Sequence, residues 1–294
     1  MGTRFGIQVV ASDESRAREA IQAAFAEVAR VEELLSEWRE TSEISAVNRA
    51  AGGEPVVVGP ELLDVVRRSI RMSELTEGAF DVTFASCGGL WSFANPRIPS
   101  RSELIVCLPL VDYRRVEIDP ERSSVFLPHG GMRIGIAGIG KGYGVDRAAD
   151  VLESHGIADY VVDGGGDVRL RGRNVDRAWG VGIAHPRKRG ELLGTVELDG
   201  GSVVSSGDYM SFFESDGVRY HHILDPATGM PAREAVAVTV IAPAATEADA
   251  LATGLFVMGP ARGLRLVESL PGVEALLLTD DLTVHASGGF PDYR

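Results

Sequence analysis

The chain of 294 residues has little of what would place it at a membrane or on a nucleic acid. No run approaches the about 18 consecutive apolar residues that a membrane-spanning helix needs. Basic residues are in the minority, with 29 Lys and Arg against 42 Asp and Glu, and the formal charge is −13. A nucleic-acid surface or an anchor on anionic lipid requires an excess of Lys and Arg. We therefore expect no nucleic-acid partner and no membrane span in this chain.

Cysteine and signal-like segments are also scarce. Cys87 and Cys107 are too few to staple a domain of this size, and no His or Cys spacing matches a zinc site, so we expect buried free thiols. The N-terminus lacks the basic segment and apolar core of a secretory signal. As written, the sequence predicts a cytoplasmic protein, although a removed leader would change that. No G-x-S-x-G elbow supports a serine hydrolase.

The composition is that of an ordinary globular protein. Apolar residues make up 45 % of the chain and charged residues 24 %, which excludes wholesale disorder. No repeat and no low-complexity linker divides it. We expect a single domain over residues 1–294, with any boundary between two subregions near residues 130–160.

Helical patterns come early in the chain and strand patterns late. Apolar residues at steps of three and four over Ala17–Trp38 predict a long helix with Ser12 as its N-cap. Pro60 suits the first turn of a second helix, and Asn95–Pro109 looks irregular. From Tyr160 onward, short β-type runs alternate with Gly and Asp turns. The pattern predicts an α+β fold with mixed or antiparallel sheets and flanking helices.

The densest glycine segment runs from Gly135 to Gly144. It nearly matches the phosphate-binding P-loop, G-x-x-x-x-G-K-[ST], but Gly142 follows Lys141 where a magnesium-binding hydroxyl is required. A P-loop NTPase is therefore disfavoured. Glycines still let backbone N–H groups approach an anion, and a lysine at a helix start adds positive charge. Tight packing of a strand on a helix explains the same glycines equally well.

Asp249 and Thr253 lie four residues apart on a predicted helix that Thr246 opens. Asp249 also stands at the third position of a capping box. Residues four apart share a helix face, and a carboxylate with a hydroxyl forms a hard oxygen pair suited to Mg²⁺. The alternative is an ordinary acid in the first turn followed by a threonine that faces the core.

His221 and His222 stand at the end of a predicted strand, before turn residues. A histidine there could carry a proton or bind a phosphate. Neighbours on a strand face opposite ways, so at least one of the two is expected to be idle. Two further clusters, Asp163–Asp167 and Ser205–Tyr209, are more typical of hairpin turns than of sites.

Eight segments, taken together and in order, resemble the ApbE family of flavin transferases over nearly the whole chain. The segments are Met1-Gly2-Thr3, Ser42-Glu-Ile-Ser45 with Asn48, Gly78-Ala79-Phe80-Asp81, Gly138-Ile-Gly-Lys141-Gly142, Asp163-Gly-Gly-Gly-Asp-Val, Ser205-Ser206-Gly207-Asp208-Tyr209, His222-Ile-Leu-Asp225-Pro226-Ala-Thr228-Gly229 and Asp249-Ala-Leu-Ala-Thr253-Gly-Leu-Phe. Most are weak alone; the shared order gives them weight.

The resemblance implies a Mg²⁺-dependent FAD:protein FMN transferase. Such an enzyme cleaves FAD, attaches FMN through a phosphoester to a Ser or Thr of a partner flavoprotein, and releases AMP. The implied fold is α+β, with FAD in the cleft between two subregions. Two alternatives remain open: a Mg²⁺-dependent FAD pyrophosphatase with water as acceptor, and a non-catalytic FAD-binding module.

The resemblance also implies residue roles. Asp249 and Thr253 would hold Mg²⁺, joined by the backbone carbonyl of Gly138. Lys141 and His222 would be catalytic. Contacts to FAD would come from Met1, Trp38, Ala79, Phe80, Asp81, Lys141, His222 and Ile223. Among these, Trp38 stands where the family places an aromatic ring against the isoalloxazine.

The chain departs from the family pattern before its lysine motif. An Asp-Leu pair is usual there, and Gly135-Ile136 stands in its place. The departure removes a carboxylate close to the expected metal, which is the feature that favours a binding module over an enzyme.

Overall fold

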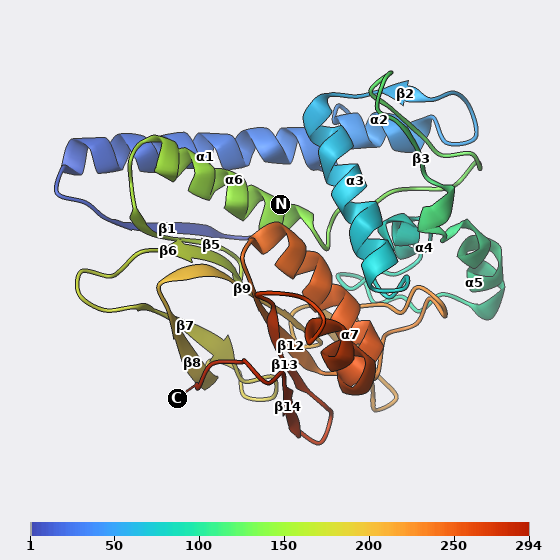
Figure 1. Cartoon of the computed structure of the whole chain (residues 1–294). Coiled ribbons are helices and arrows are strands. Elements are labelled where there is room, and N and C mark those ends of the chain that lie inside the picture. Colours follow the sequence, from blue (N-terminus) through green and yellow to red (C-terminus); the bar gives the residue numbers. More distant parts are fainter. Residues whose placement is uncertain (1, 294) are drawn as a thin grey trace.

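A seven-stranded antiparallel sheet forms the centre of the computed structural model, which describes residues 2–293 (Figure 1). In sheet order its strands are β1 (Phe5–Val10), β5 (Asp159–Gly164), β6 (Asp167–Arg171), β9 (Gly200–Gly207), β12 (Ala237–Ala242), β13 (Glu274–Leu278) and β14 (Val284–Ala286). The first strand of the chain thus pairs with strands from its second half. Met1, one of the expected FAD contacts, lies outside the described residues.

Helices cover one face of this sheet and a hairpin covers the other. The helices α6 (Gly140–Ser154) and α7 (Ala245–Val267) pack on the strands, and α1 (Glu14–Leu35) lies along α6 as an outer layer (Figure 1). The opposite face packs against the hairpin of β7 (Trp179–Ala184) and β8 (Leu192–Leu198). Within residues 2–293, no helix combines the length and apolarity needed to cross a bilayer.

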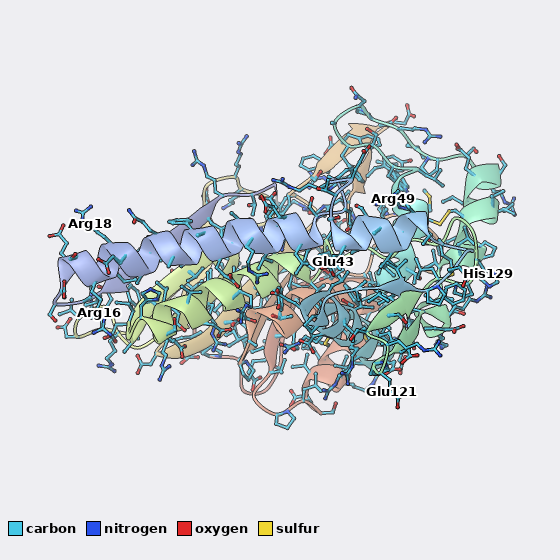
Figure 2. The ribbon with its side chains drawn as sticks, turned by 90° about the horizontal axis from the view of Figure 1, so that it is seen from above. Arg16, Arg18, Glu43, Arg49, Glu121 and His129 are labelled. Atoms are coloured by element: carbon cyan, nitrogen blue, oxygen red, sulfur yellow. A yellow bond between two sulfur atoms is a disulfide. The ribbon has the colours of Figure 1, made fainter. Side chains whose placement is uncertain are left out.

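The elements between α1 and α6 form a second region beside the main sheet, in which α3 packs against α7 (Figure 1). They are α2 (Glu43–Arg49), α3 (Pro60–Leu75), α4 (Ala85–Gly88), α5 (Arg101–Cys107), the 3₁₀ turns η1 (Val82–Phe84), η2 (Leu108–Leu110) and η3 (Tyr113–Arg115), and the small sheet of β2 (Val56–Val57), β4 (Ser124–Phe126) and β3 (Glu117–Asp119). Figure 2 shows α1 and α2 in line along one face, with Arg16 and Arg18 at one end and Arg49 at the other. One hydrophobic core runs through both regions, and the boundary near residues 130–160 stays a prediction.

The α+β class with antiparallel sheets is confirmed, but the ends of α1 differ from the prediction. The N-cap is Asp13, whose side chain accepts from the Arg16 N–H, rather than Ser12. The helix ends at Leu35, so Trp38 lies beyond it. The N-cap shifts because an ionised carboxylate one residue later serves the same orphan donors and complements the helix dipole.

The segment Asn95–Pro109 is not irregular, as the sequence suggested. It contains α5, which opens on a capping box formed by Ser100 and Glu103. A second unexpected element is β10 (Phe212–Ser215), which forms a hairpin with β11 (Val218–His221), the strand that was expected to end at the histidine pair. Both elements are short, and the proline residues around α5 obscured its helical pattern.

The prediction of free thiols is wrong. Cys87 in α4 and Cys107 in α5 form a disulfide, with an S–S distance of 2.05 Å and Cα atoms 5.3 Å apart. The sequence separation of 20 residues gives no sign that the two short helices pack together. Disulfides persist mainly in oxidising compartments. The cytoplasmic location therefore stays a prediction, and this bond is the feature that speaks against it.

Candidate active site

The N-terminal turns of α6 and α7 meet at Gly142. A Cβ at this position would overlap the carbonyl oxygen of Ala245, so only glycine permits the approach. The Gly142 N–H donates to Oδ2 of Asp249 at 3.1 Å. The packing interpretation of the glycine segment thus holds at this position, although the close approach joins two helices rather than a strand and a helix.

The predicted capping box on α7 is wrong, and the correction changes the role of Asp249. The side chain of Asp146, in α6, accepts from the Ala245 N–H at 3.0 Å and from the Thr246 N–H and hydroxyl at 2.8 and 2.6 Å. Because Asp146, 100 positions before Thr246, accepts from these donors, Asp249 does not cap α7. Its carboxylate crosses to α6 instead.

Lys141 links two buried carboxylates. Its Nζ lies 2.6 Å from Oδ2 of Asp167, the first residue of β6, and 3.1 Å from Oδ1 of Asp249. Burial opposes the lysine charge, but the two carboxylates outweigh it and raise the Lys141 pKa. Burial and the Asp249 carboxylate raise the pKa of Asp167 well above its ordinary range. The single positive charge of Lys141 therefore faces two buried carboxyl groups, Asp167 and Asp249. This excess of acidic groups favours the binding of a second cation beside them.

Asp167 is the site residue that the sequence did not single out. Its motif has the composition of a hairpin turn, and Gly165 and Gly166 do adopt φ values of +72° and +96°. Only the strand pairing reveals that the residue after them turns inward, against a lysine 26 positions earlier. An acid directly after a glycine run and at the start of a strand is the signal that could have found it.

Residues expected to bind Mg²⁺ lie close together beside this ion triad. A Cβ at Gly138 would lie 3.3 Å from Thr253 Oγ1 and 3.1 Å from the Phe80 ring, so the loop touches both. Asp249 precedes Thr253 by one turn of α7. Through the Phe80 ring, the Ala79–Phe80–Asp81 segment also lies next to Gly138.

The available donors fit a hard divalent cation. Oδ1 of Asp167 is buried and has no hydrogen-bond partner among the described residues, although a buried carboxylate oxygen normally has one. No group of three or more His, Cys, Asp or Glu within residues 2–293 is arranged to hold a metal. The expected ligands are the Asp249 carboxylate, the Thr253 hydroxyl and the Gly138 carbonyl. Only Asp249 among them is a His, Cys, Asp or Glu, so this set differs in kind from a cluster of three such side chains. Mixed oxygen donors of this kind are the ligands that Mg²⁺ prefers.

The two histidines diverge, as expected for neighbours at a strand end. His221 is buried: its Nε2–H donates to the Ala232 carbonyl at 2.9 Å, and its ring meets Phe256 edge-on with centroids 5.5 Å apart. Burial lowers the pKa of His221 to about 4, so this ring stays neutral. It is a core residue.

His222 reaches the surface with one ring nitrogen available. Its Nδ1–H donates to the Ser211 carbonyl at 3.2 Å, and this carbonyl fixes the tautomer in which Nε2 carries a lone pair. Desolvation by the surrounding atoms lowers the His222 pKa, and the positive charge of Lys141 lowers it further. The ring is therefore neutral at pH 7 and can accept a proton at Nε2. Ile223, the next residue, is buried.

The remaining expected FAD contacts differ in exposure. The Trp38 side chain is 94 % exposed, so it is not the buried end of the α1 stripe and is free to stack on a ligand. Phe80 is buried, and Ala79 is partly buried. Asp81 accepts from the Thr83 N–H and hydroxyl at 2.8 and 2.6 Å and from the Tyr113 N–H, so its carboxylate stabilises the loop.

Comparison with known proteins gives a consistent result. The sequence pattern of the ApbE family matches residues 1–277. The chain is 36 % identical to the FAD:protein FMN transferase of Vibrio cholerae over 272 residues, which is 90 % of this chain and 81 % of that protein. It is 35 % identical to the FAD:protein FMN transferase of Treponema pallidum over 291 residues, 93 % of this chain and 80 % of that one.

Solved structures agree with the sequence relatives. The crystal structure of the ApbE protein of Thermotoga maritima superimposes with a TM-score of 0.91 at 34 % identity, covering 98 % of this chain and 95 % of that one. The flavin transferase ApbE of Vibrio cholerae gives a TM-score of 0.86 at 34 % identity, with coverage of 99 % and 95 %.

Proposed function

The chain belongs to the ApbE family, and from this premise we propose that it is a Mg²⁺-dependent FAD:protein FMN transferase. It would attach FMN through a phosphoester to a Ser or Thr of an acceptor flavoprotein and release AMP. The observation that carries the proposal is the Lys141 ammonium group, held between Asp167 and Asp249 at the start of α6.

The start of α6 supplies the binding surface for the FAD pyrophosphate. Backbone N–H groups at a helix N-terminus and an adjacent lysine both attract anionic oxygens. Asp249, Thr253 and the Gly138 carbonyl would hold Mg²⁺, and bound Mg²⁺ would neutralise negative charge on the pyrophosphate oxygens. Lys141 would add the second positive charge.

His222 would accept the proton of the acceptor hydroxyl. As the Ser or Thr oxygen bonds to the phosphorus of the FMN half, the bond from that phosphorus to the bridging oxygen breaks and AMP leaves with the oxygen. The hydroxyl proton goes to Nε2 of His222. A ring that is neutral at pH 7, with Nδ1–H already donated to Ser211, suits this role.

We predict that Trp38→Ala weakens FAD binding by about 1–3 kcal/mol, the scale of one lost aromatic stack. Since the Trp38 side chain is 94 % exposed, the fold should not change. Titration of flavin fluorescence measures the affinity, and Arg39→Ala, at the neighbouring exposed residue, is the matched control. FAD affinity equal to that of the parent protein would remove Trp38 from the flavin site.

We predict that the protein binds FAD more tightly than FMN, because the site must hold the AMP half that becomes the leaving group. Calorimetric titration with both flavins tests this, and equal affinities would contradict it. Incubation with FAD, Mg²⁺ and an acceptor flavoprotein then tests the function. Transfer gives one AMP and an acceptor mass gain of FMN minus water that survives denaturation. AMP release with an unmodified acceptor indicates the pyrophosphatase, and FAD binding without AMP indicates the binding module.

A further inference from the structure

A partly buried carboxylate lies against the loop that leads into α6. Glu37 stands two residues after the end of α1, and its Oε1 accepts from the Ile136 N–H at 2.9 Å. Burial raises the Glu37 pKa, while the Ile136 N–H and the charge of Arg133 act to lower it. A partly buried carboxylate that accepts from the backbone of another segment holds that segment in place, since its loss would leave the Ile136 N–H without this acceptor.

The Glu37 carboxylate occupies the space that a side chain at position 135 would take. A Cβ at Gly135 would lie 3.1 and 3.2 Å from the two Glu37 oxygens and 2.7 Å from the Cβ of Ala85. The backbone of Gly135 is itself fixed, because its N–H donates to the Val82 carbonyl at 2.7 Å. The carboxylate that the lysine motif lacks at position 135 is therefore present at the same place, supplied by Glu37.

Ile136 connects this carboxylate to the first turn of α6. Its N–H is bound by Glu37, and its carbonyl accepts from the Gly140 N–H at 2.7 Å and from the Ile139 N–H at 3.1 Å. Gly140 begins α6, and Lys141 is the next residue. On the other side, Glu37 adjoins Trp38, whose exposed ring has no packing to hold it.

We infer that Glu37 is a positioning residue that fixes the Ile136 loop, and with it the start of α6, relative to the segment that carries Trp38. The backbone that carries Trp38 and the phosphate-binding turn would then be set at a constant separation before FAD binds. The inference rests on the proposed function for its activity readout, but FAD affinity and local backbone protection test it without any transfer step.

We expect Glu37→Ala to weaken FAD binding by about tenfold, because the Ile136 N–H loses its acceptor and the loop before α6 is no longer fixed. Amide hydrogen exchange over residues 136–140 should become faster, while the melting temperature changes little. Glu37→Gln keeps an oxygen that can accept from Ile136, so its FAD affinity and its exchange should stay close to those of the parent. Glu40→Ala, at an exposed glutamate of the same segment, is the matched control.

An exchange of positions makes the test sharper. In E37A/A85G/G135D, G135D supplies a carboxylate from the loop in place of the one removed by E37A, and A85G removes the Cβ that would clash with it. FAD affinity should recover relative to E37A. Parent-like affinity and exchange in E37A overturn the inference, as does a triple variant no better than E37A.

If E37A does not fold, the E37Q variant decides the question. Retained FAD affinity in E37Q supports the hydrogen-bonding role of Glu37, and lost affinity overturns it. A parent protein that binds FAD but transfers nothing contradicts the proposed function alone.

Discussion

Replacing Asp249 by asparagine is expected to lower Mg²⁺-dependent AMP release by at least about 10²-fold, more than the loss of a supporting group around a metal usually costs. The amide oxygen of asparagine can still accept from the Gly142 N–H, which Asp249 now binds at 3.1 Å. The junction of α6 and α7 should therefore remain intact. The variant loses the negative charge that attracts a hard cation and that pairs with Lys141 at 3.1 Å.

The measurement is the rate of AMP release from FAD as a function of Mg²⁺ concentration, with the melting temperature recorded for each variant. Asp150→Asn is the matched control, because Asp150 is an exposed acid on α6 whose one ion pair within residues 2–293 is with Arg147 in the same helix. The control should behave as the parent does. A parental rate and parental Mg²⁺ dependence in Asp249→Asn would refute the role of this carboxylate. So would activity that a chelator does not diminish.

Local features of this fold could be predicted because short stretches of sequence determine them. Pro60 begins α3 as its fixed φ suggests, and the strand pattern from Tyr160 onward corresponds to β5 and its successors. In each case the pattern lies within one short stretch of residues, although β5 pairs on one side with the distant strand β1.

Contacts between distant segments were beyond the reach of such patterns. Asp146 caps α7 across about 100 positions, Glu37 binds Ile136 across 99, and the cysteines pair through two short helices. Nothing in the composition of any one segment specifies its partner in these cases. The family resemblance supplied Lys141, Asp249 and Thr253 because their spacings lie within single motifs. It gave no sign that Glu37 restores the acid missing at Gly135, since that replacement comes from another part of the chain.

His222→Ala is expected to keep its affinity for FAD and to lose about 10²–10⁴-fold in the rate of FMN transfer, the usual contribution of a positioned general base. The His222 ring is exposed and makes one hydrogen bond, to the Ser211 carbonyl, so its removal should cost little stability. His221 cannot serve as the control, because its ring is buried against Phe256 and His221→Ala would leave a cavity. His129 is exposed and lies at the opposite end of the molecule from Arg16 (Figure 2), so His129→Ala is the suitable comparison.

The pH dependence of transfer gives the independent test of His222. Desolvation and the charge of Lys141 lower its pKa below the ordinary 6.5. Only the neutral ring can accept the hydroxyl proton, so the rate should be constant above this lowered pKa and should fall as the pH drops through it. In His222→Ala the acidic limb should disappear along with most of the rate, whereas His129→Ala should keep both. An acidic limb that persists unchanged in His222→Ala would assign the titration to another group and contradict the role of His222 as the base.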